Sequence, residues 1–199
     1  MKIIGITGQS GSGKGHLSAE FKKLGYIHAD ADKIYHGLLS SNAELKVEIV
    51  HAFGEDVLSN GEIDRKALGV KVFGKKNARK LLKLNKIAHK YVAREYISLI
   101  RKLKSEGAKG IIIDAPLLIE ARLDKICDTT VFVLAGREER IKRIMARDGI
   151  DRAAAVLRID SQKDASFYAK HCRHIFINNG CEDASLFAAD INKLLEADN

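Results

Sequence analysis

The sequence predicts an α/β fold of three layers, with helices on both faces of a five-stranded parallel sheet. Five short apolar segments have the length of buried strands, and helical patterns separate them along the chain. This alternation is typical of parallel strands joined by crossover helices. The length of 199 residues suits a single domain with insertions. The expected strands cover residues 3–7, 26–29, 110–114, 130–134 and 174–178.

The first strand leads into a glycine-rich loop. Residues 8–14 have the sequence Gly-Gln-Ser-Gly-Ser-Gly-Lys, which fits G-x-x-x-x-G-K, and a short helix ending at Gly25 follows. The glycines let the main chain wrap a phosphate, the helix start supplies N–H groups, and Lys14 supplies a positive charge. The sequence therefore predicts a nucleoside triphosphate site in a P-loop fold of the nucleotide-kinase type. The alternative is a glycine-rich turn that binds nothing.

The residue after Lys14 departs from the usual loop pattern. Most such loops place Ser or Thr there, and its hydroxyl coordinates Mg²⁺. This chain has Gly15 and then His16, and Gly15 has no side chain to ligate a metal. Adenylate kinases are similar in carrying Gly at this point, so we expect nucleotide oxygens and water to hold the metal. His16 either touches a phosphate from the first helical turn or faces solvent.

Two carboxylates follow the second strand, as Asp30-Ala31-Asp32. Ligands of open parallel sheets gather at the carboxyl ends of the strands, so these residues are expected to face the phosphate loop. Asp32 is a candidate to accept the proton of an attacking hydroxyl, and Asp30 a candidate to hold a metal-bound water. The alternative for Asp30 is a cap on the following helix.

The interval between the second and third strands is too long for one crossover. It predicts a helical insertion at about 35–105 that contains one long amphipathic helix with its apolar stripe in the core. Asn60-Gly61-Glu62 is expected to form a turn between helices.

The third strand ends in Asp114, which resembles the carboxylate of a Walker B strand. We assign no certain metal ligand, but expect Asp32 or Asp114 to reach Mg²⁺ through water. Pro116, the only proline of the chain, fixes a rigid turn just after this strand.

An arginine-rich segment at about 137–170 lies between the last two strands and is predicted to form a lid. Its arginines recur every three or four residues, a spacing that can offer planar donors to a transferred phosphate. The alternative is a solvated helix face whose buried side carries Ile141, Ile144 and Met145. The arginines are Arg137, Arg140, Arg143 and Arg147, with Arg158 in the next helix.

Charge and composition limit the partners. The formal net charge of +8 fits either a polyanionic ligand or a lysine-rich solvated surface. Because the lysines are widely spread and few aromatic residues interleave with them, we expect no nucleic-acid partner. No apolar run approaches the ~18 residues of a membrane span, so we expect no membrane partner. The 3 cysteines lack metal-ligand spacing, which favours a cytoplasmic location.

Together these motifs resemble one family, the dephospho-CoA kinases, in order from residue 2 to about residue 195. The family's Asp-Ala-Asp before a helix containing His is similar to residues 30–36, and its Asp-x-Pro-Leu-Leu-x-Glu is similar to residues 114–120. Other similar segments are Ala52-Phe53-Gly54, residues 61–65, the lid at 143–149 with Arg158 and Gln162, and Asn178-Asn179-Gly180, expected near the adenine of ATP.

The resemblance implies the last step of coenzyme A synthesis. ATP phosphorylates the ribose 3′-hydroxyl of dephospho-CoA, giving CoA and ADP, with Mg²⁺ as cofactor. Asp32 aligns with the family's proposed base, and Lys14 and Arg147 complete the implied catalytic set. The implied ATP-binding residues are Ser10, Gly11, Ser12, Gly13, Lys14, Gly15, His16, Arg143 and Asn178. The implied acceptor-binding residues are Asp30, His36, Arg65, His89, Pro116 and Leu117.

Departures from the family pattern keep alternatives open. Gly15 and His16 replace two hydroxyl residues, and Lys90 replaces the proline that normally follows the histidine at position 89. The Gly-Lys-Gly tripeptide also fits a nucleoside monophosphate kinase, although the Phe-Pro-Arg segment of adenylate kinases is missing. A nucleotide-binding module without transfer activity is the non-catalytic alternative. We expect a monomer.

Overall fold

The computed structural model describes residues 1–197, which form two compact units. The sheet unit comprises Met1–Asp30 and the chain from Leu103 onward. The helical unit comprises Ala31–Lys102. None of the helices in the described residues combines the length and hydropathy that crossing a bilayer requires.

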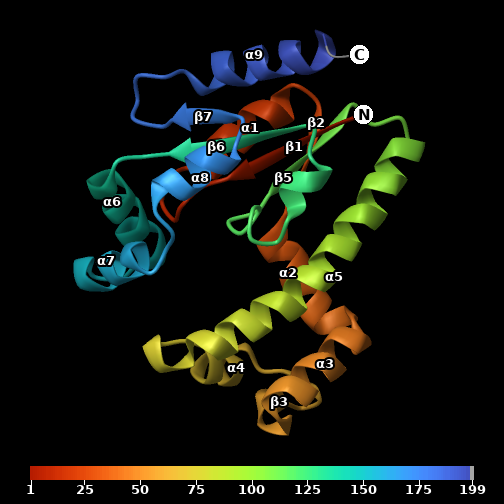
Figure 1. Ribbon diagram of the computed structural model, residues 1–199, viewed down its shortest axis with the longest axis vertical. Coiled ribbons are helices and arrows are strands. Elements are labelled where there is room, and N and C mark those ends of the chain that lie inside the picture. Colours follow the sequence, from red (N-terminus) through yellow and green to blue (C-terminus); the bar gives the residue numbers. More distant parts are fainter. Residues whose placement is uncertain (198–199) are drawn as a thin grey trace. The chain divides into compact units, whose positions relative to one another are not determined.

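The sheet unit is built on five parallel strands in the order β2-β5-β1-β6-β7 (Figure 1). The predicted five-stranded parallel sheet is therefore confirmed. Because β1 lies at the centre, the loop that follows it emerges in the middle of the sheet edge, where ligands of such sheets bind. The strands are β1 (Lys2–Thr7), β2 (Tyr26–Asp30), β5 (Gly110–Asp114), β6 (Thr129–Leu134) and β7 (His174–Ile177).

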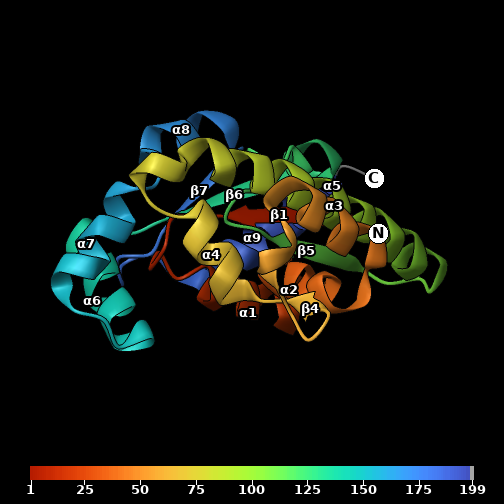
Figure 2. The same ribbon diagram turned by 90° about the horizontal axis from the view of Figure 1, so that it is seen from below.

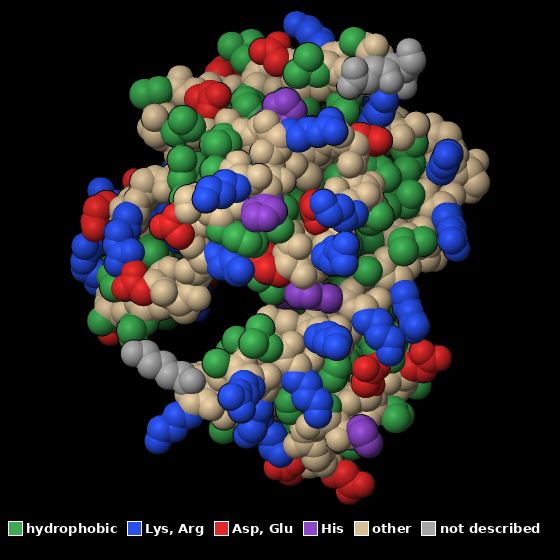
Figure 3. Space-filling view, viewed as in Figure 1, with side chains coloured by type: hydrophobic (Ala, Val, Ile, Leu, Met, Phe, Trp, Pro, Cys, Tyr) green, Lys and Arg blue, Asp and Glu red, His purple; other side chains and the backbone are tan. Residues whose placement is uncertain are grey.

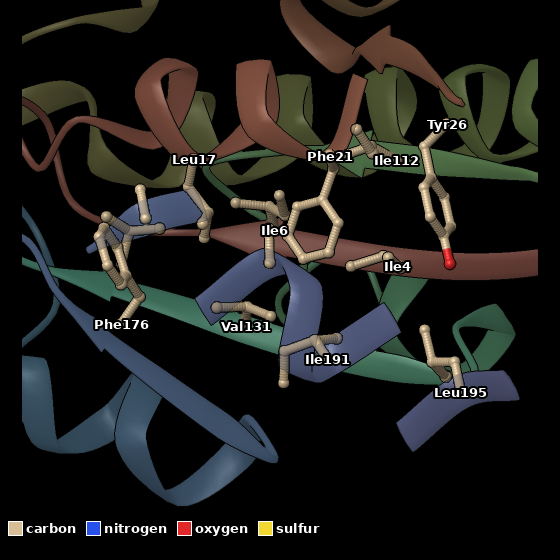
Figure 4. Packing of buried hydrophobic residues seen from close by; sticks show 13 residues of the cluster. Ile4, Ile6, Leu17, Phe21, Tyr26, Ile112, Val131, Phe176, Ile191 and Leu195 are labelled. Atoms are coloured by element: carbon tan, nitrogen blue, oxygen red, sulfur yellow. The ribbon is translucent and has the colours of Figure 1, made fainter. Parts of the chain in front are cut away.

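Alternating side chains place a helical layer on each face of the sheet, as predicted. Helices α1 (Lys14–Lys23) and α9 (Ala184–Ala197) cover one face, where Phe21 packs with Ile6 and Val131 in a fully buried cluster (Figure 4). On the other face Phe132 stacks on Tyr168 of α8 (Ala165–His171), with ring centroids 5.2 Å apart. Val131 and Phe132, neighbours on β6, thus point to opposite faces of the sheet, and each packs against the helical layer on its own face.

The arginine-rich segment folds into a helical hairpin between β6 and α8. Helices α6 (Arg137–Asp148) and α7 (Arg152–Asp160) lie side by side in both Figure 1 and Figure 2. Ile141 and Ile144 are fully buried against Ala155 and Ile159. These residues form the buried side that their spacing predicts.

The helical unit contains four helices in the described residues and one small hairpin. Asn60 and Gly61 connect β3 (Leu58–Ser59) to β4 (Glu62–Ile63). The prediction that this turn joins two helices is therefore wrong, because it joins two antiparallel strands. Both turn residues have positive φ, 51° and 78°, as a tight hairpin turn requires. The helices are α2 (Ala31–Ser41), α3 (Ala43–Phe53), α4 (Arg65–Val72) and α5 (Ala78–Ser105).

Helix α5 runs unbroken through His89 and Lys90. A proline at position 90 would remove one backbone hydrogen bond and clash with the preceding turn. Lys90 instead donates to Glu48 of α3 at 2.8 Å. The departure from the family pattern at this position therefore leaves the helix unbroken, as predicted.

Candidate active site

The loop between β1 and α1 is shaped by two glycines with positive φ. Gly11 has φ +78°, and a Cβ added there would lie 2.6 Å from the carbonyl oxygen of Arg140. Gly13 has φ +90°, and a Cβ there would lie 2.1 Å from Nδ2 of Asn178. Only glycine allows the main chain to pass this close to the lid and to the loop after β7.

Helix α1 begins at Lys14 without a capping side chain on Gly13. The N–H groups of a first helical turn have no partner within the helix, and the helix dipole makes this end positive. The Lys14 ammonium donates to the carbonyl of Gly8 at 3.1 Å, which folds its side chain back across the loop. Backbone and side chain together form a cradle for an anion.

Two predicted ATP-binding side chains from distant parts of the sequence meet on this loop. Asn178, directly after β7, donates to the carbonyl of Ser12 at 2.8 Å. Arg143 of α6 donates to the same carbonyl at 3.2 Å and to that of Gly11 at 3.4 Å. These donors satisfy loop carbonyls that would otherwise repel a phosphate.

The lid arginines have separate environments. Arg147 donates through Nε and Nη2 to Asp148 at 2.8 and 2.9 Å, and its Nη2 lies 3.5 Å from the hydroxyl of Ser10. Arg158 also pairs with Asp148, so one carboxylate holds two guanidinium groups. Hydrogen bonds from Arg147, followed by the charges of both arginines, lower the pKa of Asp148 to about 2. Figure 3 shows acidic and basic side chains interleaved over this hairpin.

The other two arginines of α6 differ from Arg143 and Arg147 in their surroundings. Arg137 pairs with Asp160 of α7 at 2.7 Å. Arg140 is only 5% exposed and lies inside the sheet unit. Helical spacing alone cannot distinguish these positions, because the burial of Arg140 depends on what α6 packs against.

Two carboxylates end neighbouring strands at the edge where the loop lies. Asp30 of β2 is the register partner of Asp114 of β5. Asp114 is 8% exposed; its Oδ2 lies 3.1 Å from Nε2 of His28 and accepts from Ser18 at 3.4 Å. His28 belongs to no sequence motif, but the two-residue period of a strand places its side chain on the same face of the sheet as that of Asp30.

The turn after β5 is held by a hydrogen bond from the phosphate-loop strand. The Thr7 hydroxyl donates to the carbonyl of Pro116 at 3.2 Å. Leu117, also predicted to bind the acceptor, is 36% exposed. Pro116 and Leu117 are thus positioned beside the C-terminal end of β1.

The residues fit a magnesium ion held mainly by nucleotide oxygens. Gly15 offers no side-chain oxygen, and Asp30 and Asp114 offer carboxylates at adjacent strand ends. In residues 1–197 no group of three or more His, Cys, Asp or Glu side chains forms a metal cage. This donor set is typical of Mg²⁺, which keeps several waters and takes one or two carboxylates beside phosphate oxygens.

The helical unit has a pocket of about 760 Å³ within itself. Leu39, Leu68 and Leu84 give it apolar walls, and His36 and Arg65, both predicted to bind the acceptor, also line it. A long ligand with charged and apolar parts would find both kinds of surface here.

The remaining predicted residues of the helical unit lie outside this lining. Asp32 is in the first turn of α2, two residues beyond the end of β2. His89 lies on α5, where burial lowers the pKa of its imidazole, and its Nε2 has no hydrogen-bond partner in the described part of the chain. A neutral imidazole with an unsatisfied nitrogen is suited to bind a polar ligand atom.

Comparisons with known proteins agree on one family. The model of the family described as dephospho-CoA kinase matches residues 2–183. Dephospho-CoA kinases of Carboxydothermus hydrogenoformans and Arabidopsis thaliana are 37% and 35% identical, over 90% and 92% of this chain and 87% and 78% of their own.

Solved structures support the same comparison. A Thermus thermophilus protein aligns with a TM-score of 0.77 at 30% identity, covering 98% of this chain and 97% of its own. Dephospho-CoA kinase from Campylobacter jejuni aligns with a TM-score of 0.68 at 27% identity, covering 100% of both chains. Shikimate kinase from Acinetobacter baumannii, at 14% identity and a TM-score of 0.53, shares the fold.

Proposed function

The chain belongs to the dephospho-CoA kinase family, and from this premise we propose that it phosphorylates dephospho-CoA with ATP. In this reaction the ribose 3′-oxygen forms a bond to the γ-phosphorus while the bond from that phosphorus to the β,γ-bridging oxygen breaks, giving CoA and ADP. The observation that carries the proposal is the ordered family match over residues 2–183, joined to a loop shaped for phosphate.

The loop and the lid bind the phosphates of ATP. The start of α1 and the Lys14 ammonium take the β- and γ-phosphates, where charge develops during transfer. Arg143, already on the loop carbonyls, and Arg147, 3.5 Å from the Ser10 hydroxyl, add cationic groups from the lid side. Guanidinium groups suit this role because they offer paired donors to phosphate oxygens.

Asp32 takes the proton of the attacking hydroxyl. A carboxylate within hydrogen-bond reach of that hydroxyl orients it and accepts the proton as the new P–O bond forms. The position of Asp32 supports this role because only Ala31 separates it from Asp30 at the end of β2. Asp30 is assigned to the acceptor side and to water near the phosphates.

Magnesium neutralises charge on the phosphates when it is bound. Asp32 or Asp114 would reach its water shell, and Asp30 would hold a metal-bound water. Because residue 15 supplies no hydroxyl, the metal depends on nucleotide oxygens more strongly than in loops with Ser or Thr.

The acceptor occupies the helical unit in this proposal. Arg65 and His36 on the pocket lining suit the diphosphate of dephospho-CoA, and the leucine walls suit its pantetheine arm. His89 offers one more polar contact. Within the sheet unit, Pro116 and Leu117 of the turn after β5 are assigned to acceptor binding.

The location and assembly state are further proposals. The free thiols of Cys127, Cys172 and Cys181 support a reducing compartment such as the cytoplasm. We propose a monomer, which size-exclusion chromatography with light scattering tests directly.

The experiment is an ADP-release assay with ATP, Mg²⁺ and dephospho-CoA, with mass spectrometry of the product. We expect a product of CoA mass, and expect Asp32→Asn to lower kcat at least ~100-fold while ATP binding stays intact. Asp190→Asn, an exposed carboxylate on α9, is the matched control. Full activity of Asp32→Asn would remove the base assignment. Faster transfer to AMP or CMP than to dephospho-CoA would make the chain a nucleoside monophosphate kinase.

A further inference from the structure

Arg140 is a buried cation that the proposed chemistry does not use. Its side chain leaves α6 toward the interior and is 5% exposed. Burial, the largest cause, and the nearby charge of Arg137 lower its pKa, although a guanidinium stays protonated at any physiological pH. Burying a charge is costly unless its donors are satisfied, so the partners of Arg140 show what the burial achieves.

The guanidinium of Arg140 uses three separate donors, two toward the phosphate loop and one toward Gln162. Its Nε donates to the carbonyl of Ser10 at 3.0 Å, and Nη1 donates to Oε1 of Gln9 at 2.8 Å. Its Nη2 donates to Oε1 of Gln162 at 2.9 Å. Each acceptor is neutral, and no carboxylate pairs with Arg140 among residues 1–197.

The two glutamines complete a closed network around residues 9 and 10 of the loop. Oε1 of Gln162 also accepts the backbone N–H of Ser10 at 3.0 Å. Nε2 of Gln9 donates to the carbonyl of Lys163 at 2.8 Å. The N–H and the carbonyl of Ser10 are therefore both bound by side chains of the lid segment, so the orientation of the two peptide groups that flank Ser10 depends on Arg140 and Gln162.

This arrangement has two consequences for an anion on the loop. First, the Ser10 carbonyl is held toward Arg140, so its negative end is satisfied and is kept from a phosphate. Second, a positive charge without a carboxylate partner lies beneath the loop, where low dielectric strengthens its effect on a bound anion. The rigid fork of Arg supplies both the charge and the geometry, which Lys cannot reproduce.

We propose that Arg140 is a positioning residue that, together with Gln162, holds the phosphate loop in its nucleotide-binding conformation and couples it to the lid. The inference rests on the proposed function only in that the loop binds ATP. The alternative role is packing alone, in which Arg140 stabilises the fold without an effect on the ligand.

Isothermal titration calorimetry with ADP and with a non-hydrolysable ATP analogue tests the proposal, beside thermal unfolding of each variant. We expect Arg140→Met to weaken nucleotide binding at least ~10-fold, which corresponds to ~1.4 kcal/mol. Arg140→Lys keeps the positive charge but loses the planar set of guanidinium donors, and we expect its nucleotide affinity to lie between those of Arg140→Met and the wild type. Arg152→Met, an exposed lid arginine paired with Glu138, is the matched control with unchanged affinity.

Gln162→Leu keeps the proposal testable if Arg140→Met does not fold. This change removes the acceptor shared by Arg140 and the Ser10 N–H, and we expect nucleotide affinity to fall at least ~5-fold at temperatures where the variant is fully folded. Affinity within twofold of the wild type in folded Arg140→Lys and Gln162→Leu would overturn the proposal and leave packing alone. Because binding is measured without an acceptor, this result is independent of whether dephospho-CoA is the substrate.

Discussion

Gly15→Ser should lower the Mg²⁺ concentration that the enzyme needs for half-maximal activity, without disturbing the fold. A Cβ added at Gly15 meets no atom within 4 Å, and the residue does not have the positive φ of its neighbours Gly11 and Gly13. The new hydroxyl would stand in the first turn of α1, where most loops of this kind place a metal ligand.

The expected magnitudes follow from this geometry. Serine has a better helix propensity than glycine by about 0.5 kcal/mol, which corresponds to a rise in Tm of about 1–2 °C for a chain of this size. Replacing one water of the metal shell by a protein oxygen is worth about 1 kcal/mol, so the half-saturating Mg²⁺ concentration should fall about fivefold.

The assay is a Mg²⁺ titration of ADP release at fixed ATP, with thermal unfolding of the same samples. Gly15→Ala is the matched control, because alanine improves the helix by about 1 kcal/mol but provides no ligand. A second control is Gly13→Ser, whose Cβ would lie 2.1 Å from Asn178 Nδ2 and should abolish tight ATP binding. The reasoning is refuted if Ser and Ala at position 15 shift the Mg²⁺ dependence equally, or if Gly15→Ser lowers Tm.

Three further predictions concern the sheet unit. Partial burial raises the pKa of the Cys127 thiol to about 12 and that of Cys172 to about 11. At pH 8 Ellman's reagent should therefore modify exposed Cys181 rapidly and the other two much more slowly until the protein unfolds, and three equally rapid reactions would contradict this. Because the pKa of Asp148 is lowered to about 2, its contribution to stability is complete above about pH 4 and is lost as the pH falls through 2. The Tm difference between the wild type and Asp148→Asn should therefore shrink from about pH 5 to about pH 2. A constant difference would argue against the ion pairs of Asp148. Tyr26→Phe removes a buried hydrogen bond of 3.0 Å from the Tyr26 hydroxyl to Oδ1 of Asn192 on α9. It should lower the free energy of unfolding by about 1–2 kcal/mol in urea titrations, whereas an unchanged midpoint would mean that water replaces the hydroxyl.

Local patterns were sufficient for the sheet and the loop. Apolar segments bounded by polar turns predicted all five strands of the parallel sheet within one residue at each end, because a strand buried on both faces must be apolar throughout. The glycine spacing predicted the phosphate loop, since positive φ at Gly11 and Gly13 excludes other residues. The turn at Asn60 was interpreted wrongly because strands of two residues have no detectable period.

What the sequence determined by itself was the fold class, the loop and the family, since each depends on residue types at fixed short spacings. Only the tertiary structure distinguished the lid arginines: equal helical spacing placed Arg143 on the loop carbonyls, Arg137 on Asp160 and Arg140 in the interior. It also brought Gln162 to the Ser10 amide, a contact across 152 residues. The physical reason is that a helix carries its side chains in every direction, so the role of each depends on the surface that lies opposite. That surface belongs to distant parts of the chain, and folding alone brings it there.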